Sequence, residues 1–434
     1  MGVGCSNGAG TDGPLADDDL LAAEGEPTAC GPDGGTPTPD AGGPTNPGNP
    51  DDLTVFKDPG KGPWTVVPES QVLAKCKLDP AAMRTAASKL GAFAVVRYGQ
   101  LCWQSSGRDA PSQMFSATKT LGATVTGIAS WETRNIPRTG KKTGQLKDTD
   151  RADHWLDRVT YNKDALLSHV LSMTGHNANL AHGSKRYTYD TIGTTQINTL
   201  SNMVSTAISQ DRARLGTTTG AFAKKFLFDE IGMTQSSWGG TQYATSWTGT
   251  LQDMARLGNL LIHQGVWSGK RILGADWVYK MTHPAYEDAN TAYGYLTWLN
   301  TREGAAGIGG ALVSGGAAGD PCAPPAVWQR YPHGNSGARD CTYRNTSCTQ
   351  KNDVGVFSAQ GLGGQFIVGH PGLDLVIVAK NFNNNGPTGL WQAVRPAVVA
   401  ADSTYRGNEA GFCRAYAAGD YAPDLAAPRV QPAN

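Results

Sequence analysis

The first regular patterns of apolar and polar positions appear after residue 53. Residues 80–90 (PAAMRTAASKL), which have a proline near the start, predict a helix. Two short apolar runs follow, at 92–97 and 101–105, and the turn-forming segment at 98–100 separates them. Short apolar runs joined in this way are typical of a β-hairpin, so we expect one here.

Helical patterns dominate from Ser116 to about residue 282. Two clear examples are LLSHVLSM at 166–173 and LQDMARLGNLLIHQG at 251–265. Apolar residues that recur at helical spacing form one face of a helix, which buries itself against a core. This stretch therefore predicts a helical region.

Strand-like runs return late in the chain. VGVFSAQ at 354–360 is one, and QFIVGHPGLDLVIVAKN at 365–381 contains two more around a turn at 370–373. A further helix is expected over 388–401. Strands therefore lie at both ends of the folded body, with helices between them.

This order of elements predicts the fold class. We expect an α/β (α+β) body over 53–434, in which one antiparallel sheet is assembled from both chain ends and flanked by helices. The sheet part covers about 53–110 and 354–434, and the inserted helical part covers about 111–302.

Residues 303–353 interrupt the pattern of strands and helices. They are rich in Gly and Ala, then in Pro, and contain Cys322, Cys341 and Cys348. A loop of this length is uncommon in a compact domain and is often functional. We expect this insert to form a lid or wall over a site. At least one disulfide would hold it, since Cys341 and Cys348 close a small loop and Cys322 can bridge elsewhere.

Residues 1–52 predict a disordered tail or tether. They contain ten acidic residues, no Lys or Arg, many Gly and Pro and few large apolar side chains. Such a segment cannot bury enough apolar surface to offset the entropy cost of ordering. The tail therefore does not contribute to the predicted core.

The start of the tail, MGVGCSNG, has three interpretations. The residues before Cys5 resemble the end of a bacterial lipoprotein signal, although the expected leucine and a preceding apolar region are missing. In that case Cys5 would carry the lipid, and the body would lie in the periplasm or outside the cell on a membrane tether. Met1, Gly2 and Ser6 also fit the N-myristoylation pattern. The third interpretation is a segment left by expression.

Charge and apolar content narrow the classes of partner. All 37 Lys and Arg residues and 27 of the 37 acidic residues lie beyond the tail, so the body has a formal charge of +10. That charge favours either anionic partners or a mildly basic solvated surface. No basic cluster alternates with aromatic residues, so we expect no nucleic-acid partner. No apolar run approaches the roughly 18 residues that span a bilayer.

Cysteine and histidine spacing indicates neither a metal site nor a cofactor. None of the eight cysteines forms a C-x-x-C pair, and none of the eight histidines lies in an H-E-x-x-H motif. Scattered cysteines in a Gly-rich chain of low charge favour an oxidising compartment with some disulfides, and buried reduced thiols are the alternative.

The candidate nucleophile is Ser116, in the sequence Phe-Ser-Ala-Thr-Lys-Thr. Ser116 and Lys119 are three residues apart, which places both side chains on one face of the helix that starts here. A helix N-terminus favours negative charge and so suits a forming oxyanion. A lysine can take the serine proton only if burial and nearby positive potential lower its pKa. Alone, this motif also fits a helix cap beside a surface lysine.

Several further stretches of sequence follow this motif along the chain and belong to the same pattern. They are LLSHVLSMTG, RYTYDTIG with Tyr189, GMTQSSWGG, LQDMARLGNLLIHQGVWSGKRIL, YGYLTWLN and GLGGQFIVGHPGLDLVIVAKN. With FSATK they resemble the serine β-lactamase and penicillin-binding family over about residues 90–382. The chain resembles most the class C β-lactamase-like branch, which includes family-eight carboxylesterases and nylon-oligomer (aminohexanoate-dimer) hydrolases.

The resemblance implies roles for particular residues. Tyr189 would be the catalytic tyrosine that moves a proton together with Lys119, and a buried structural tyrosine is the alternative. The family's Y-x-N asparagine corresponds here to Thr191, a substrate-binding candidate that keeps a hydroxyl but has no amide. The family's Lys-Thr-Gly on the strand beside the nucleophile is absent, and we treat the literal match at 142–144 as chance.

Gly361, Leu362 and Gly363 are the candidates on that strand. Glycines would let the strand backbone approach a substrate closely, so Gly361 and Gly363 are expected to line the binding site. The backbone N–H groups of Ser116 and Leu362 would form an oxyanion hole, with Ala359 as the alternative second donor. The alternative interpretation of the same sequence is a glycine bulge that only bends the strand.

These inferences predict a serine hydrolase that forms an acyl-enzyme with a small-molecule ester or small linear amide. A β-lactamase or D-Ala peptidase is the second candidate. A slowly acylating penicillin-binding-like sensor and an inactive binding module remain further alternatives, although the presence of Ser116, Lys119 and Tyr189 opposes an inactive module.

Overall fold

The computed structural model describes most of the body of the chain. Its described residues are 53, 56–107, 109–162, 164–175, 189, 191–283, 285–286, 293–299, 357–382 and 386–399, with the backbone of four short strands at 330–332, 341–343, 402–403 and 407–408. The predicted tail, including Cys5, lies outside these residues and remains a prediction.

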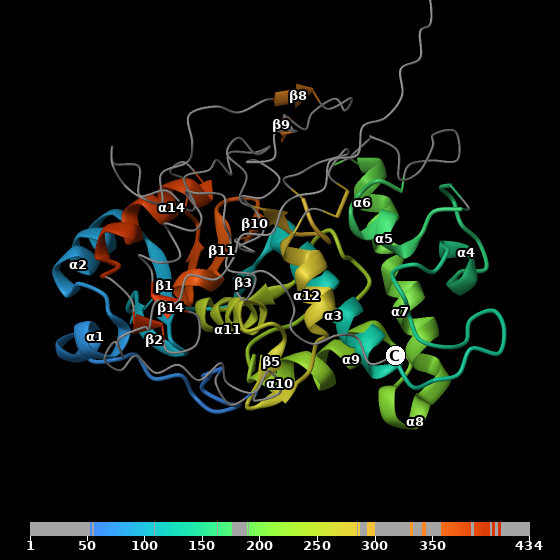
Figure 1. Cartoon of the computed structure of the whole chain (residues 1–434), viewed down its shortest axis with the longest axis horizontal. Helices are drawn as coiled ribbons and strands as arrows, with labels where there is room; N and C mark the ends of the chain where they lie inside the picture. Colours follow the sequence, from blue (N-terminus) through green and yellow to red (C-terminus); the bar gives the residue numbers. More distant parts are fainter. Residues whose placement is uncertain are drawn as a thin grey trace, which may run out of the picture. The chain divides into compact units, whose positions relative to one another are not determined.

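A six-stranded antiparallel sheet with the strand order β2-β1-β12-β11-β10-β7 organises the body (Figure 1). Its strands are β1 (Ala92–Arg97), β2 (Gln100–Gln104), β7 (Trp298–Leu299), β10 (Phe357–Gly361), β11 (Gln365–His370) and β12 (Leu375–Lys380). The β1–β2 hairpin pairs with β12, so that Ala92 lies opposite Lys380. The sheet is thus assembled from both chain ends, and the predicted fold class is confirmed.

Helices connect and surround these strands. They are α1 (Glu69–Cys76), α2 (Pro80–Lys89), α3 (Thr118–Glu132), α4 (Ala152–Trp155), α5 (Leu167–Leu171), α6 (Thr191–Asn198), α7 (Leu200–Ile208), α8 (Arg212–Leu215), α9 (Thr219–Ala223), α10 (Asp229–Ile231), α11 (Leu251–Ile262), α12 (Ala275–Thr282) and α14 (Gly386–Val394). The helical region predicted between the two halves of the sheet is therefore present.

Both faces of the sheet are covered, which explains why every residue of β12 is buried. On one face, α11 approaches so closely at Gly258 that a β-carbon there would lie 2.6 Å from Val376. His370, which pairs with Leu375 and therefore points to the opposite face, stacks on Trp391 of α14 at 5.6 Å. The layers are thus α11, the sheet, and α14 with α2 beside it (Figure 1).

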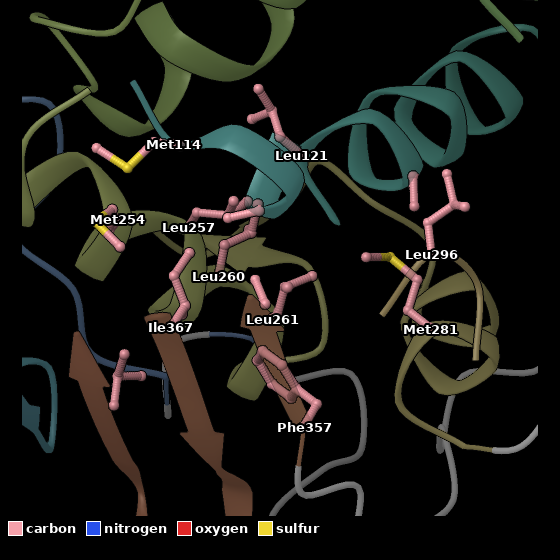
Figure 2. Packing of buried hydrophobic residues seen from close by; sticks show 14 of the residues in the cluster. Met114, Leu121, Met254, Leu257, Leu260, Leu261, Met281, Leu296, Phe357 and Ile367 are labelled. Carbon is pink, nitrogen blue, oxygen red and sulfur yellow. The ribbon is translucent and has the colours of Figure 1, made fainter. Parts of the chain in front are cut away.

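The apolar layer between α11 and the sheet forms the main core. Figure 2 shows Leu260 and Leu261 of α11 directed towards the strands that carry Phe357 and Ile367, with Leu257 beside them on the same helix. All five side chains are at most 2% exposed. Burial of apolar surface on this scale is the dominant stabilising contribution to a fold, and here it holds the late strands in place beneath the helical region.

Helix α3 runs through the centre of the helical region. Thirteen of its fifteen residues are buried, from Thr118 to Ser130. Small residues make this possible, since a β-carbon at Gly122 would lie 2.4 Å from the ring of Tyr243 and one at Gly127 would lie 2.3 Å from Trp277. A helix enclosed in this way gives its first turn a rigid support.

Some element boundaries differ from the predictions. The helix expected over 166–173 is the shorter α5, and the one expected over 388–401 begins at Gly386 and ends as α14 at Val394, followed by the 3₁₀ turn Arg395–Ala397. Pro396 explains the early end, because proline cannot continue the α-helical hydrogen-bond pattern. A disulfide joins Cys76 at the end of α1 to Cys102 in β2.

Within the insert at 303–353, the structure describes only the backbone of β8 (Arg330–Pro332) and β9 (Cys341–Tyr343), which pair antiparallel. The proposed lid and the bridges of Cys322 and Cys348 lie outside the described residues and stay predictions. No helix in the described part of the chain is long and apolar enough to cross a membrane.

Candidate active site

Ser116 lies in a short 3₁₀ turn, η2 (Phe115–Ala117), directly before α3 begins at Thr118. The sequence places Ser116 at the first turn of the helix, and the structure shows this turn to be tighter than α-helical. Phe115 adopts a φ of 46°, a left-handed conformation that is uncommon for a residue other than glycine. Such strain persists where neighbouring structure holds the backbone, and it clusters at functional sites.

The neighbouring structure that holds the turn is the segment ending at Trp247. The backbone N–H of Met114 donates to the carbonyl of Trp247 at 2.7 Å, and the N–H of Trp247 donates to the hydroxyl of Thr118 at 3.0 Å. Ser116 is thus enclosed between two anchored residues, one on each side.

Lys119 points back at the nucleophile. Its Nζ donates to Ser116 Oγ at 2.9 Å and to the backbone carbonyl of Ala244 at 3.1 Å. The residue is only 3% exposed, and this burial lowers its pKa to about 8. A lysine with that pKa is neutral in about a tenth of molecules at pH 7 and in about half of them at pH 8, so its neutral form is accessible for general-base catalysis.

Tyr189 completes the group. Its hydroxyl shares a hydrogen bond with Ser116, its ring lies 4.8 Å from Lys119 Nζ, and burial raises its pKa. The ring packs against Trp298 at 5.3 Å and Tyr293 at 6.2 Å, which fixes its plane. The structure therefore brings the three candidate side chains together, although Tyr189 is 70 residues further along the chain than Lys119.

Thr191 begins α6, two residues after Tyr189. Its backbone belongs to the described helix, whereas its side chain lies outside the described residues. Its role as the counterpart of the family's asparagine therefore stays a prediction.

Gly361 and Gly363 have different environments. Gly361, the last residue of β10, faces the nucleophile turn, and a β-carbon there would lie 2.1 Å from the carbonyl oxygen of Met114. This contact is with the chain's own backbone, and the role of Gly361 in lining the substrate site stays a prediction. Gly363 lies in the β10–β11 turn with a φ of +76°. Between them, Leu362 is 74% exposed, and its N–H as an oxyanion donor remains a prediction.

The strand beside the nucleophile is uncharged. Phe357, Ser358 and Ala359 of β10 are all buried. The literal Lys142-Thr143-Gly144 occupies a turn outside the sheet, where the Thr143 hydroxyl accepts from the N–H groups of Thr139 and Gly140. This position agrees with treating the match as chance.

Two contributors to the site were absent from the sequence-based candidates. The first is Ala244, whose contribution is a backbone carbonyl, a group that every residue has and that therefore leaves no trace in the sequence. The second is Trp298, whose stretch YGYLTWLN matched the family pattern without a role. Within the described residues there is no group of three or more side chains arranged to hold a metal ion.

Comparisons with known proteins concern the fold. No protein-family model matches the chain, and no curated protein matches it. Solved structures with a similar fold include a beta-lactamase from Mycobacterium bovis (16% identity, TM-score 0.45, covering 75% of this chain and 99% of that one). A family VIII carboxylesterase (14%, 0.45, 77% and 99%) and a penicillin-binding protein homolog from Caulobacter crescentus (13%, 0.45, 77% and 99%) also match. At such low identity, the chemistry of this chain rests on its own residues.

Proposed function

We propose that this protein is a serine hydrolase that acts through an acyl-enzyme on a small uncharged ester or linear amide. The observation that carries the proposal is the 2.9 Å contact between Lys119 Nζ and Ser116 Oγ, together with the burial that lowers the pKa of Lys119 to about 8. A serine hydroxyl becomes a useful nucleophile when an adjacent base takes its proton, and Lys119 is placed to do so.

The reaction proceeds in two halves. Neutral Lys119 takes the Ser116 hydroxyl proton while Oγ bonds to the substrate carbonyl carbon. The bond to the leaving group then breaks, and the leaving oxygen or nitrogen receives the proton from Lys119 or through the Tyr189 hydroxyl. A water molecule, activated by the same groups, attacks the acyl-enzyme and releases the acid together with free Ser116. The shared contacts of Ser116, Lys119 and Tyr189 support this short proton path.

The oxyanion formed in each half needs hydrogen-bond donors. The N–H groups of Ser116 and Leu362 are our candidates, because Leu362 directly follows Gly361, which abuts the nucleophile turn. Leu362 exposes 74% of its surface to solvent, so its side chain is available to contact the substrate. Preorganised donors of this kind typically contribute about 10² to 10³ in rate.

An uncharged substrate suits this site better than a carboxylate-bearing β-lactam. Strand β10 offers no cation beside the nucleophile. Lys380 on β12, two strands away, already donates to the Ala110 carbonyl and lies 3.9 Å from the Asp109 carboxylate. A neutral ester needs no counter-ion, and an alkoxide leaves more readily than the unprotonated nitrogen of an amide.

We further infer that the enzyme works in an oxidising compartment, such as the periplasm or the exterior of a bacterial cell, and is tethered there if Cys5 is lipidated. The Cys76–Cys102 disulfide supports this placement, because structural disulfides are rare in reducing compartments.

Intact-mass measurement after treatment with a fluorophosphonate probe tests the proposal. We expect one adduct, which peptide mapping assigns to Ser116, and no adduct in the Ser116→Ala variant. An adduct on another serine, or equal labelling of the variant, would contradict the proposal. An adduct that forms with a β-lactam and persists for hours, with no turnover of esters, would favour the slowly acylating sensor.

A further inference from the structure

The loop of residues 242–247 supplies the second acceptor for Lys119. The Ala244 carbonyl accepts from Lys119 Nζ at 3.1 Å, while Trp247 at the end of the loop bonds to both sides of the nucleophile turn. Ser246 adopts a φ of 86°, so the loop backbone is strained between these two contacts. The buried Tyr243 holds the loop from the side of α3, where its hydroxyl bonds to Thr126 at 3.2 Å. The position of the Ala244 carbonyl also depends on what holds the loop from the other side.

Asn198, the last residue of α6, holds this loop with both ends of its amide. Its Oδ1 accepts from the N–H of Ala244 at 3.2 Å, and its Nδ2 donates to Gln242 Oε1 at 3.1 Å. The two bonds place Ala244 from one side, and the Ala244 carbonyl faces Lys119. Asn198 itself makes no described contact with Ser116 or Lys119, so any influence it has on them passes through the loop.

Helix α6 connects this anchor to Tyr189. Tyr189 precedes the helix by two residues, and Asn198 ends it. The helix has eight residues and so spans about 12 Å at 1.5 Å per residue. Its C-terminal end is secured where Thr199 donates to the Gln196 carbonyl at 2.6 Å and bonds to the Tyr161 hydroxyl at 2.9 Å. Tyr189, which bonds to Ser116, and Asn198, which holds the Ala244 loop, thus lie at the two ends of one short helix.

We propose that Asn198 is a positioning residue that fixes the Ala244 carbonyl against the Lys119 ammonium and so sets how tightly Lys119 holds its proton. The inference rests on the proposed function, in which Lys119 takes the Ser116 proton. A carbonyl that accepts from an ammonium stabilises its charged form, so loosening the carbonyl makes the proton easier to lose.

The groups that face the Lys119 ammonium are few, so loosening the Ala244 carbonyl should change the proton affinity of Lys119 measurably. The Ser116 hydroxyl faces its ammonium from η2, the Tyr189 ring faces it from the segment before α6, and the Ala244 carbonyl faces it from the loop. Among the described residues, burial is the cause of its lowered pKa and no charged side chain contributes. No ion pair is therefore present to mask the loss of one carbonyl acceptor.

The test is the rate of fluorophosphonate labelling of Ser116, followed from pH 5 to 10. In the wild type the rate should rise with pH around a midpoint near 8, where Lys119 becomes neutral. In Asn198→Ala, we expect the midpoint to fall by about half a unit or more, which is about a threefold change in proton affinity. A midpoint that stays within 0.2 units of the wild type (an order-of-magnitude limit) would overturn the inference.

Two further variants separate this effect from general loosening. Gln242→Ala removes the second partner of Asn198 but leaves the bond to the Ala244 N–H, so its midpoint should fall by less than that of Asn198→Ala. Asn198→Asp keeps an oxygen acceptor for that N–H and adds negative charge, so its midpoint should rise. If Asn198→Ala does not fold, a fall of the midpoint in Asn198→Asp overturns the inference. If the wild type forms no Ser116 adduct, the proposed function itself is contradicted. If the wild type is labelled but the Asn198→Ala midpoint is the same as that of the wild type, only this inference is contradicted.

Discussion

Gly361 at the end of β10 abuts the carbonyl of Met114, two residues before the nucleophile, and leaves no room for a side chain between them. The late strand of the sheet and the start of the helical region thus meet at backbone distance. This contact sets the position of the strained turn at Phe115 relative to the strand that would bind the substrate.

Gly361→Ala is therefore expected to damage both stability and acylation. Its β-carbon would lie 2.1 Å from the Met114 oxygen, so one backbone has to move. Overpacking of this kind costs about 1–3 kcal/mol, and a shifted turn should slow Ser116 labelling at least tenfold. Urea unfolding and labelling rates measure the two effects. Gly239→Ala is the control, because a β-carbon at Gly239 meets nothing within 4 Å. Equal behaviour of the two variants would contradict the contact.

The pH dependence of the enzyme should follow Lys119. Lys119 acts as a base only when neutral, and its pKa is lowered to about 8, so kcat/KM should rise with pH up to about 8 and level off above it. Lys119→Arg keeps its charge throughout this range and cannot take a proton, so we expect a loss of at least about 10² with no such rise. Ester hydrolysis measured across this range checks both, and near-normal turnover of Lys119→Arg would refute the assignment.

Tyr189→Phe should lower kcat by roughly 10² to 10⁴, the usual contribution of a general acid–base group. The change removes the hydroxyl bonded to Ser116 and keeps the ring packed on Trp298. Tyr293→Phe is the matched control, because the Tyr293 hydroxyl donates to the sulfur of Met173 at 3.5 Å. Steady-state kinetics of both variants are compared. Similar losses in the two would indicate that Tyr189 is structural.

Short-chain esters should be preferred over cephalosporins. Losing a charged hydrogen bond to a substrate carboxylate costs about 1.5–3 kcal/mol, which is roughly ten- to a hundredfold in affinity. We therefore expect kcat/KM for nitrophenyl butyrate to exceed that for a chromogenic cephalosporin by at least about tenfold. Ser116→Ala should abolish both activities. A clear preference for the cephalosporin would make β-lactam hydrolysis the better proposal.

Removing the Cys76–Cys102 disulfide should lower stability without changing the chemistry. The bridge joins residues 26 positions apart, and closing a loop of that length stabilises a fold by about 3.5 kcal/mol. Urea unfolding with and without a reductant measures the difference, and Ser116 labelling in the absence of urea should remain normal. An unchanged unfolding midpoint, or free thiols at both positions in the native protein, would show that the bridge does not form.

Much of the fold could be predicted because its signals are local. The β1–β2 hairpin depends on two apolar runs around a turn, and α11 depends on apolar spacing within twelve residues. The predicted end of the last helix is less accurate, because Pro396 stops the helix earlier than the composition of the segment indicates. The antiparallel sheet followed from the presence of strands at both chain ends. Its exact register, with Ala92 opposite Lys380, depends on packing between distant segments.

The candidate site likewise contains some residues that the sequence identifies and others that it does not. Ser116 and Lys119 could be paired from the sequence alone, because residues three apart share one face at a helix start. Tyr189 required the family resemblance, since nothing in its own spacing points to Ser116. Ala244 and Asn198 could not be found at all. Ala244 contributes only a backbone carbonyl. Asn198 lies 46 positions before Ala244 and acts through its hydrogen bond to the loop that carries this carbonyl.

The sequence by itself determined which groups can react: a hydroxyl and an amine three residues apart, followed later by a phenol. Only the tertiary structure decided whether the amine can act as a base. The pKa of Lys119 depends on the water that is removed from around it and on the acceptors left to it. Apart from Ser116, the described groups around its ammonium come from distant segments, the Ala244 carbonyl and the Tyr189 ring. Desolvation is a property of the assembled surroundings, so no spacing along the chain encodes it directly.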